Sequence, residues 1–250
     1  MNEVKKENQE VLAESTGYDM VYANNEPVSE MTMKGFPTER IGAVIYFLKN
    51  TNIPCGKDVS VLDIGCGNGQ LLFNLKSMFG KLCGIEFSKN RAAHAADNLK
   101  GYDSEIICDD FLLHNFNRKF NILVSADVVE HVPDVFGFFK KANELLNIGG
   151  YFVLNTPNVM YLRYRMQFVF GRFPSTALKD EGMSVRAEGE MYDAGHLHYF
   201  NYSVLRKMAR KFGFEVIQET GIGRLGRLHN IYPPLTSGSC NMMLRKVKDI

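Results

Sequence analysis

Val59-Ser-Val-Leu-Asp-Ile-Gly-Cys-Gly-Asn-Gly69 is the stretch of this 250-residue chain that decides its fold. Its first half is an apolar, β-branched run of the kind that is buried in a parallel sheet. Its second half places glycine at positions 65, 67 and 69, where a backbone without Cβ atoms can approach a ligand closely. Residues from Gln70 onward predict a helix, with apolar positions at Leu71, Leu72, Leu75, Met78 and Phe79. A strand, a glycine turn and a helix in this order predict a nucleotide-like ligand at the edge of an open α/β sheet.

Two further predicted strands end in acidic residues. Leu82 to Phe87 carries Glu86 near its tip, and a carboxylate there can accept hydrogen bonds from both ribose hydroxyls. Ser104 to Phe111 contains the adjacent acids Asp109 and Asp110, either of which can accept from an adenine amino group while Phe111 packs nearby. A dinucleotide fingerprint would need Gly-x-Gly-x-x-Gly, but Gln70 stands where its third glycine belongs. This departure disfavours an NAD-dependent enzyme.

In this order of strand, glycine turn and two acidic tips, the chain resembles the class I S-adenosylmethionine-dependent methyltransferases over about residues 41–154. The resemblance implies a Rossmann-like, doubly wound α/β sheet, mostly parallel, with an antiparallel last strand. It also implies S-adenosyl-L-methionine as the methyl donor and S-adenosyl-L-homocysteine as the product. The cofactor-binding residues that it implies are Arg40, Asp63, Gly65, Gly67, Gly69, Glu86, Phe87, Asp109, Asp110, Phe111 and Ala126. For Arg40, on a predicted helix from Thr38 to Lys49, the alternative is an ordinary solvated arginine.

The segment after the predicted fourth strand, Phe120 to Asp127, resembles the ubiquinone-biosynthesis-like and MetW-like branches of that family. The resemblance places Val128-Val-Glu-His-Val-Pro-Asp134 opposite the transferred methyl group. In ubiquinone-type relatives two acids and the adjacent histidine can hold a divalent cation, and Asp127, Glu130 and His131 match that set with Asp where the family has Glu. Relatives without a metal share this spacing, so no metal site is assigned.

An aromatic-rich insertion follows the predicted fifth strand, Gly150 to Pro157. Residues 158–173 are rich in aromatic and apolar side chains, and residues 174–192 are polar and interrupted by glycine, which predicts a lid over the acceptor. The alternative for the aromatic residues is packing as a helix on the core. The insertion also carries Arg163, Arg165, Arg172 and Arg186, which suit a phosphate or carboxylate on the acceptor or are simply solvated.

Two histidines are the candidate general bases, His196 and His131, because imidazole titrates near neutrality. His196 and Phe200 match a His-to-Phe spacing that many relatives carry before a helix, predicted here over Tyr202 to Phe214 and closed by Gly213. The alternatives are structural: His131 orients its loop, and His196 holds the lid. Phe214 to Thr220 and Cys240 to Val247 predict a final antiparallel pair of strands, with residues 225–238 as the loop between them.

Length and composition fit a single methyltransferase domain. Its expected parts are an N-terminal helical cap (1–50), a cofactor-binding core (51–157), the acceptor-site insertion (158–200), and a C-terminal helix with the last two strands (201–250). Five cysteines without pairing or metal-ligand spacing, and the lack of an apolar leader or membrane span, predict a soluble cytoplasmic protein with reduced thiols. A net charge of +1 gives no reason to expect a nucleic-acid partner. The oligomeric state is left open.

Three classes of function follow. The leading hypothesis is O-methylation of a small-molecule hydroxyl, on a sugar, a phosphorylated or nucleotide-linked intermediate, or a quinone precursor. The second is N-methylation of a small amine, which the same fold supports. The third is a MetW-like partner protein of a homoserine acyltransferase, which the chain resembles through Asn155-Thr-Pro-Asn158 and Gly171-Arg-Phe-Pro174.

Overall fold

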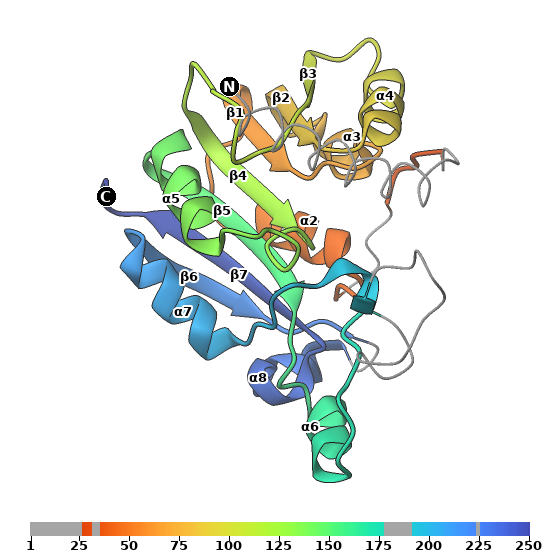
Figure 1. Ribbon diagram of the computed structural model, residues 1–250. Coiled ribbons are helices and arrows are strands. Elements are labelled where there is room, and N and C mark those ends of the chain that lie inside the picture. The colour runs from red at the N-terminus through yellow and green to blue at the C-terminus, as the bar shows by residue number, and fades with distance from the viewer. Residues whose placement is uncertain (1–26, 32–35, 178–191, 224–225) are drawn as a thin grey trace, which may run out of the picture. The chain divides into compact units, whose positions relative to one another are not determined.

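The computed structural model describes residues 27–31, 36–177, 192–223 and 226–250, drawn as ribbons in Figure 1. The chain divides into two compact units. The first unit comprises residues 1–31 and 54–117, and the second comprises residues 32–53 and 118–250. The single-domain boundaries expected from the sequence stay a prediction.

Three parallel strands form the first unit, in the order β3-β2-β1. They are β1 (Gly56–Ile64), β2 (Phe79–Glu86) and β3 (Ser104–Cys108), joined by helices α3 (Gln70–Leu75) and α4 (Lys89–Asn98). Ile64 pairs with Ile85, and Glu86 pairs with Cys108. The glycine turn, Glu86 and the acids after β3 therefore leave the strands at the same edge, where parallel strands present their carboxyl ends.

The helix predicted from Gln70 is shorter than its apolar pattern indicated. It ends at Leu75, and Phe79 is the first residue of β2, where its side chain is buried. Gly80 explains the break, because a Cβ atom at this position would lie 2.3 Å from the carbonyl oxygen of Lys57. The chain must pass this close to β1, and only glycine allows such an approach.

The second unit carries four strands, in the order β4-β5-β7-β6. They are β4 (Phe120–Ala126), β5 (Leu146–Pro157), β6 (Phe214–Thr220) and β7 (Ser239–Lys246). β4 and β5 are parallel, whereas β7 runs antiparallel to both β5 and β6, which confirms the predicted antiparallel final pair.

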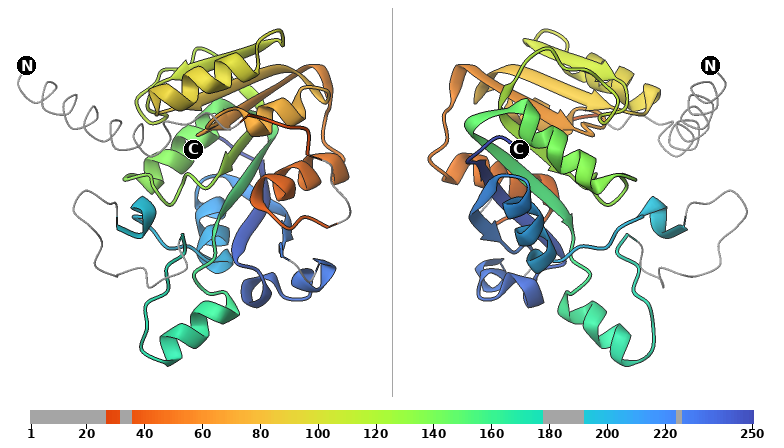
Figure 2. Two further views of the ribbon diagram at one scale, coloured as in Figure 1. Left: turned by 90° about the vertical axis from the view of Figure 1, so that its right-hand side faces the viewer. Right: turned by 60° about the vertical axis from the view of Figure 1, so that its left-hand side comes forward.

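Helices cover both faces of these four strands. α2 (Arg40–Asn50) lies on one face, and α5 (Val135–Leu145) and α7 (Tyr202–Lys211) lie on the other, as the two views of Figure 2 show. The core under α5 is aromatic: Phe139 stacks on Phe212 at 5.8 Å between ring centroids and meets Phe152 at 6.3 Å. Burial of such large rings is the main stabilising contribution in this unit.

The described part of the insertion forms a helix that is not buried. α6 (Leu162–Val169) has no buried residue, which contradicts for this helix the alternative that the aromatic residues pack on the core. Leu162, Met166, Val169 and Phe170 are exposed on it. The predicted lid loop falls mainly on residues 178–191, outside the described residues. Between β6 and β7 the expected loop contains short helices, η2 (Gly226–Asn230) and α8 (Pro233–Thr236).

All five cysteines carry free thiols, as expected. Cys66, Cys83 and Cys240 are buried, whereas Cys55 and Cys108 are exposed. Cys66 fills the space beside Gly84, where a Cβ atom would lie 2.6 Å from its sulfur. Burial raises the pKa of Cys66 and of Cys240, so both remain thiols rather than nucleophilic thiolates at neutral pH.

Candidate active site

The glycine turn after β1 needs glycine at three positions. Gly65, Gly67 and Gly69 have φ angles of 70°, 57° and 83°, in the left-handed region that other residues adopt rarely. Gly67 is also short of space, because a Cβ atom there would lie 2.4 Å from a guanidinium nitrogen of Arg91. Gly69 then serves as the N-cap of α3. The turn expected from the sequence is therefore present, with its backbone held close to the sheet edge.

Glu86, the acid predicted to bind ribose, organises this turn. The side chain is buried and accepts hydrogen bonds from the backbone N–H of Gly67 (2.8 Å) and of Ser88 (3.0 Å), one on each carboxylate oxygen. An ionised carboxylate oxygen can accept more than one hydrogen bond. Glu86 can thus hold the turn and still accept from a ligand hydroxyl.

Asp63 lies at the end of β1, paired in register with Gly84, and is almost completely buried. Burial, followed by the charge of Glu86, raises the pKa of Asp63 from 3.8 to about 8, while Arg91 opposes the rise. At neutral pH this side chain is therefore mostly a protonated carboxyl that can donate a hydrogen bond. Its predicted role toward the cofactor stays a prediction.

The acids after β3 are brought beside Glu86 by the sheet. The N–H of Asp109 donates to the Glu86 carbonyl at 3.1 Å. The Asp109 carboxylate is exposed and pairs with His114 at 2.8 Å, whereas Asp110 Oδ1 accepts from the N–H of Leu112 at 2.6 Å. Phe111 is buried against Phe116, and Phe87 is half-buried directly after Glu86. All the residues of this predicted cofactor set that belong to the first unit share one sheet edge.

Arg40 and Ala126, also predicted to bind the cofactor, belong to the second unit. Ala126 is the half-buried last residue of β4. Arg40, the first residue of α2, forms an ion pair with Asp127, whose φ angle is 57°. Burial raises the pKa of Asp127, and the guanidinium of Arg40 opposes that rise. The structure therefore gives Arg40 a partner that neither of the two interpretations from the sequence included.

Glu130 is a buried carboxyl in the loop after β4. Its Oε2 accepts from the Thr156 hydroxyl at 2.9 Å, whereas its Oε1 is buried without a hydrogen-bond partner among the described residues. Burial, followed by the charge of Asp127, raises the pKa of Glu130 to about 8. Its carbonyl oxygen accepts the N–H groups of Leu197 and His198 at 2.8 and 3.1 Å. These two bonds tie the loop after β4 to the segment that carries His196.

The two candidate bases, His131 and His196, face each other. Their ring centroids are 4.8 Å apart and the rings are inclined at 71°. His131 Nδ1 lies 3.0 Å from the Gly195 carbonyl oxygen, and His196 Nδ1 lies 2.6 Å from the Thr176 hydroxyl oxygen. Burial lowers the pKa of both imidazoles, that of His196 to about 4 with His131 as the second cause. Both rings are therefore neutral at pH 7.

Sequence reasoning missed the polar groups behind His196. Ser175, Thr176 and Asp193 are buried, and Asp193 accepts hydrogen bonds from Ser175, Thr176 and Tyr199. The available signal was Asp193 itself, an acid three residues before a candidate base. Two of its hydroxyl partners, Ser175 and Thr176, lie 18 and 17 residues earlier, and their bonds to it follow no sequence spacing.

The metal hypothesis named Asp127, Glu130 and His131, but the structure groups different donors. Asp127 pairs with Arg40, and the third donor close to Glu130 and His131 is His196. The ligand atoms of these last three residues lie within 4.8 Å of one another. Both imidazoles have Nδ1 directed at protein groups, the Gly195 carbonyl for His131 and the Thr176 hydroxyl for His196.

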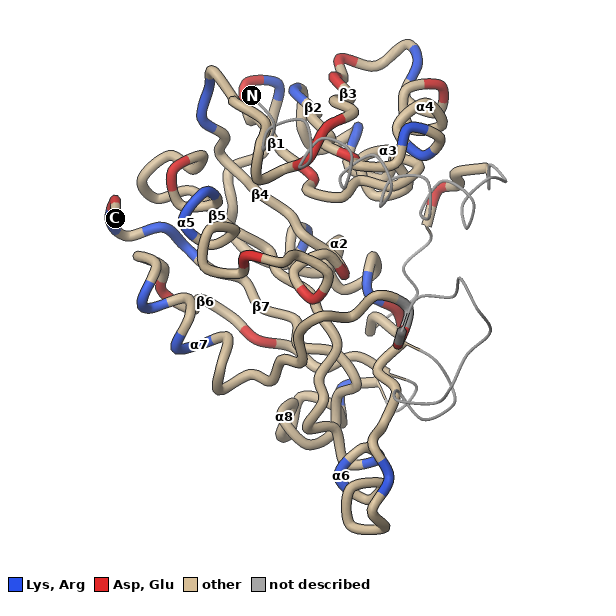
Figure 3. The backbone as a smooth tube through the Cα atoms, viewed as in Figure 1, with Lys and Arg blue, Asp and Glu red and all other residues tan. Residues whose placement is uncertain are grey.

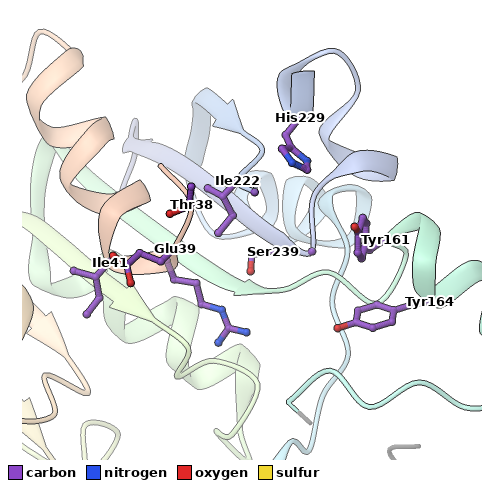
Figure 4. Close-up of a pocket in the computed structure, with 11 residues that line it drawn as sticks. Thr38, Glu39, Ile41, Tyr161, Tyr164, Ile222, His229 and Ser239 are labelled. Atoms are coloured by element: carbon purple, nitrogen blue, oxygen red, sulfur yellow. The ribbon is translucent and has the colours of Figure 1, made fainter. Parts of the chain in front are cut away.

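A cavity of about 660 Å³ lies in the second unit next to Arg40. It is bounded by the start of α2, by the start of α6 and by the segments around η2 and β7. In Figure 4, Tyr161 and Tyr164 lie across the cavity from Thr38 and Glu39, with Ser239 between them. The remaining lining residues are Arg40, Ile41, Ile222, Gly223, His229 and Gly238. A cavity of this size accommodates a small molecule.

Comparison with known proteins identifies the class. The fold resembles that of an S-adenosylmethionine-dependent methyltransferase from Clostridium acetobutylicum, with a TM-score of 0.62 and 16% identity over 84% of this chain and 91% of that one. It also resembles magnesium protoporphyrin IX methyltransferase from Synechocystis, crystallised with bound S-adenosylhomocysteine, with a TM-score of 0.56 and 15% identity over 82% and 81% of the two chains. The chain therefore has the α/β fold of the class I methyltransferases.

The family follows from residues 38–219, which match the family described as "Methyltransferase domain". The chain belongs to this family. Ubiquinone biosynthesis O-methyltransferase from Pelagibacter ubique is 30% identical over 106 residues, which cover 41% of this chain and 43% of that protein. The same-named protein of Hydrogenovibrio crunogenus is 23% identical over 167 residues, 65% of each chain. The chain thus spans less than two thirds of these relatives.

No helix in the described part of the chain has the length and apolar content needed to cross a membrane.

Proposed function

We propose that this methyltransferase transfers its methyl group to a hydroxyl oxygen of a small molecule, with His196 as the general base. The observation that carries the proposal is the pair of facing, neutral imidazoles of His131 and His196. A hydroxyl must lose its proton as its oxygen attacks the methyl carbon, so a positioned neutral base accelerates the reaction. The relatives named as O-methyltransferases support oxygen as the accepting atom.

The cavity next to Arg40 is the proposed acceptor site. Arg40 lines it and also pairs with Asp127, four residues before His131, which connects the cavity with the loop that bears the histidines. Its walls combine two tyrosine rings with the hydroxyls of Thr38 and Ser239. Such walls suit a ring-shaped acceptor with hydroxyl groups, whose faces contact the tyrosines while its hydroxyls form hydrogen bonds.

An anionic acceptor finds less support among the described residues. Arg163 and Arg172 are exposed, Arg165 Nε donates to the Met160 carbonyl at 2.6 Å, and none of these three lines the cavity. The basic residues of α6 are marked in Figure 3. Arg186 lies outside the described residues. A neutral or weakly charged acceptor is therefore the proposal.

The cofactor is proposed to bind at the sheet edge of the first unit. Glu86 would accept hydrogen bonds from the ribose hydroxyls of the cofactor, and the methionine part would lie against the turn from Gly65 to Gly69. Asp110 is preferred over Asp109 for the adenine amino group, because the Asp109 carboxylate is already paired with His114. Asp63 supplies a protonated carboxyl beside the turn.

The first test is calorimetric titration with S-adenosylmethionine and S-adenosylhomocysteine, followed by turnover measured as S-adenosylhomocysteine release. The hydroxylated probes are catechol and glucose, which are uncharged, with UDP-glucose as the anionic comparison, and ethanolamine is the amine probe. Turnover of a hydroxylated probe that His196→Ala lowers about 100-fold, with cofactor affinity unchanged, is expected for a general base. Turnover of ethanolamine at its nitrogen would favour N-methylation. Cofactor binding without turnover, together with a stable complex with a homoserine acyltransferase, would favour the partner-protein alternative.

A further inference from the structure

Asp193 is the centre of a buried hydrogen-bond cluster with Ser175, Thr176 and Tyr199, called the clasp below. Its side chain has no exposed surface. One carboxylate oxygen accepts from the Ser175 hydroxyl at 2.5 Å, and the other accepts from the Tyr199 hydroxyl at 2.9 Å. The second oxygen also faces the N–H and the hydroxyl of Thr176, at 3.5 and 3.4 Å. All four contacts direct a donor at a carboxylate oxygen, so Asp193 is the acceptor in each of them.

The backbone of Asp193 is held in an uncommon conformation. Its φ angle is 43°, a left-handed value that disfavours residues with a Cβ atom. Such strain persists only where surrounding contacts over-determine it, and it concentrates at functional sites. Here the contacts are the three hydroxyl groups around the carboxylate.

His196 is joined to this clasp through Thr176. Its Nδ1 lies 2.6 Å from the Thr176 hydroxyl oxygen and 3.8 Å from the nearer oxygen of Asp193. The Thr176 hydroxyl donates to Asp193 Oδ2 at 3.4 Å. Its oxygen then accepts from His196, which requires the proton of the neutral imidazole to be on Nδ1.

His131 reaches the same tautomer by a different contact. Its Nδ1 faces the carbonyl oxygen of Gly195, and a carbonyl can only accept, so this nitrogen also carries the proton. The Nε2 atoms of both facing rings then carry lone pairs. The tautomer of His196 depends on the side chain of Thr176, so a substitution at Thr176 can change it.

We propose that Asp193 and Thr176 are positioning residues that hold His196 in the Nδ1–H tautomer, with the Nε2 lone pair directed to the hydroxyl of the acceptor. The inference rests on the proposed function for its last step. In that step the acceptor O–H proton passes to His196 Nε2, the new O–CH3 bond forms, and the S–CH3 bond breaks with its electron pair going to sulfur. S-adenosylhomocysteine leaves, and the imidazolium returns its proton to water.

The test reads the tautomer directly, by two-bond nitrogen–proton NMR of the full chain with nitrogen-15 in its six histidines. His196→Ala assigns the signal. The wild-type protein is expected to show a protonated Nδ1 and an unprotonated Nε2 at His196. Thr176→Val, nearly isosteric but without a hydroxyl, is expected to move most of the population to the Nε2–H form, and Asp193→Asn to do the same. Thr176→Ser restores the hydroxyl and is the matched control that keeps the wild-type pattern.

Turnover of the best hydroxylated probe supplies the second measurement. Thr176→Val is expected to lower kcat about 100-fold, the scale of a lost general base, while S-adenosylhomocysteine affinity stays unchanged and Thr176→Ser stays within a few-fold of the wild type. A wild-type His196 protonated on Nε2, or a Thr176→Val spectrum like that of the wild type, overturns the inference. If His196→Ala retains turnover, the proposed function fails, and the tautomer spectra still decide whether the clasp orients His196.

Discussion

At the residue scale, the candidate site depends on carboxyl groups that the fold keeps away from water. Asp63 in the first unit and Glu130 in the second are both buried, and the pKa of each is raised to about 8. Desolvation is the largest cause in both cases, and a neighbouring acid is the second. Each group therefore has a measurable effect on how stability changes with pH.

Substitution of Asp63 by Asn is expected to remove one source of pH dependence. The folded pKa of Asp63 is about 8 and its ordinary value is 3.8, so between these values the folded protein binds more protons than the unfolded chain. Stability contributed by this group is present below about pH 4 and is lost as pH rises through 8. Urea unfolding at pH 5 and pH 8 should therefore show that Asp63→Asn gains stability relative to the wild type as pH increases.

The control for this prediction is Asp58→Asn on the same strand, because the Asp58 side chain is fully exposed. Its stability should follow that of the wild type at both pH values. A constant difference between wild type and Asp63→Asn across this range would contradict the raised pKa.

Single residues differ in how far the sequence could predict their place. The glycines at 65, 67 and 69 were predictable because a turn of this kind needs left-handed backbone at those positions. The carboxylate tips were predictable because parallel strands end at one edge. Thr176 and Asp193 were not, because their contact joins residues 17 apart through side-chain geometry alone. The pairing of Arg40 with Asp127 escaped prediction for the same reason.

At the element scale, the end of α5 is completed by a buried lysine. Lys246 on β7 donates to the carbonyl oxygens of Asn143 and Leu146 at 2.6 and 3.0 Å, and also pairs with Asp249. The last carbonyls of a helix lack partners within the helix and carry partial negative charge. The ammonium group satisfies one carbonyl of the last turn and the carbonyl of the C-cap residue, and it joins the end of α5 to β7.

Lys246→Met is expected to lower the free energy of unfolding by about 2 kcal/mol, because two buried carbonyls lose a charged donor. Chemical denaturation followed by circular dichroism measures this loss. Lys140→Met on the exposed face of α5 is the matched control, with an expected change within about 0.5 kcal/mol. Equal effects of the two substitutions would show that the buried contacts contribute little.

Helices and strands were predictable where one spacing of apolar residues dominated the sequence, and less so where a second signal competed with it. The strands of the second unit, including the antiparallel pair β6 and β7, agree with their apolar runs. α3 was overextended because Met78 and Phe79 continue a helical spacing that Gly80 interrupts. The alternative interpretation packed the aromatic residues of α6 on the core, yet none of its residues is buried. Apolar content alone does not say what covers a helix.

At the scale of the whole molecule, the two candidate binding functions belong to different units. The proposed ribose and adenine contacts belong to the first unit, and the cavity and both candidate bases belong to the second. This division explains why the sequence predicted the class of cofactor but did not predict the identity of the acceptor. The first unit uses a turn with fixed backbone requirements, whereas the acceptor cavity is built from segments spread between residues 38 and 239.

S-adenosylhomocysteine is expected to stabilise the whole protein through Glu86. A ligand at about 100 times its dissociation constant adds about 2.7 kcal/mol to stability when it binds only the folded state. Thermal unfolding with and without S-adenosylhomocysteine measures this as a rise in Tm. Glu86→Gln should lose most of the rise, whereas His196→Ala should keep it. The opposite pattern would place the cofactor away from the sheet edge of the first unit.

The distribution of buried thiols has a practical consequence for following how this protein opens. Cys66 and Cys83 are buried in the first unit and Cys240 in the second, so each unit contains a thiol whose reaction reports the opening of that unit. An alkylating reagent attacks the thiolate, and a buried thiol with a raised pKa reacts only after its surroundings open. Once the exposed Cys55 and Cys108 are replaced, mass spectrometry of alkylated peptides measures the rate at which each unit opens. No label has to be added to the chain.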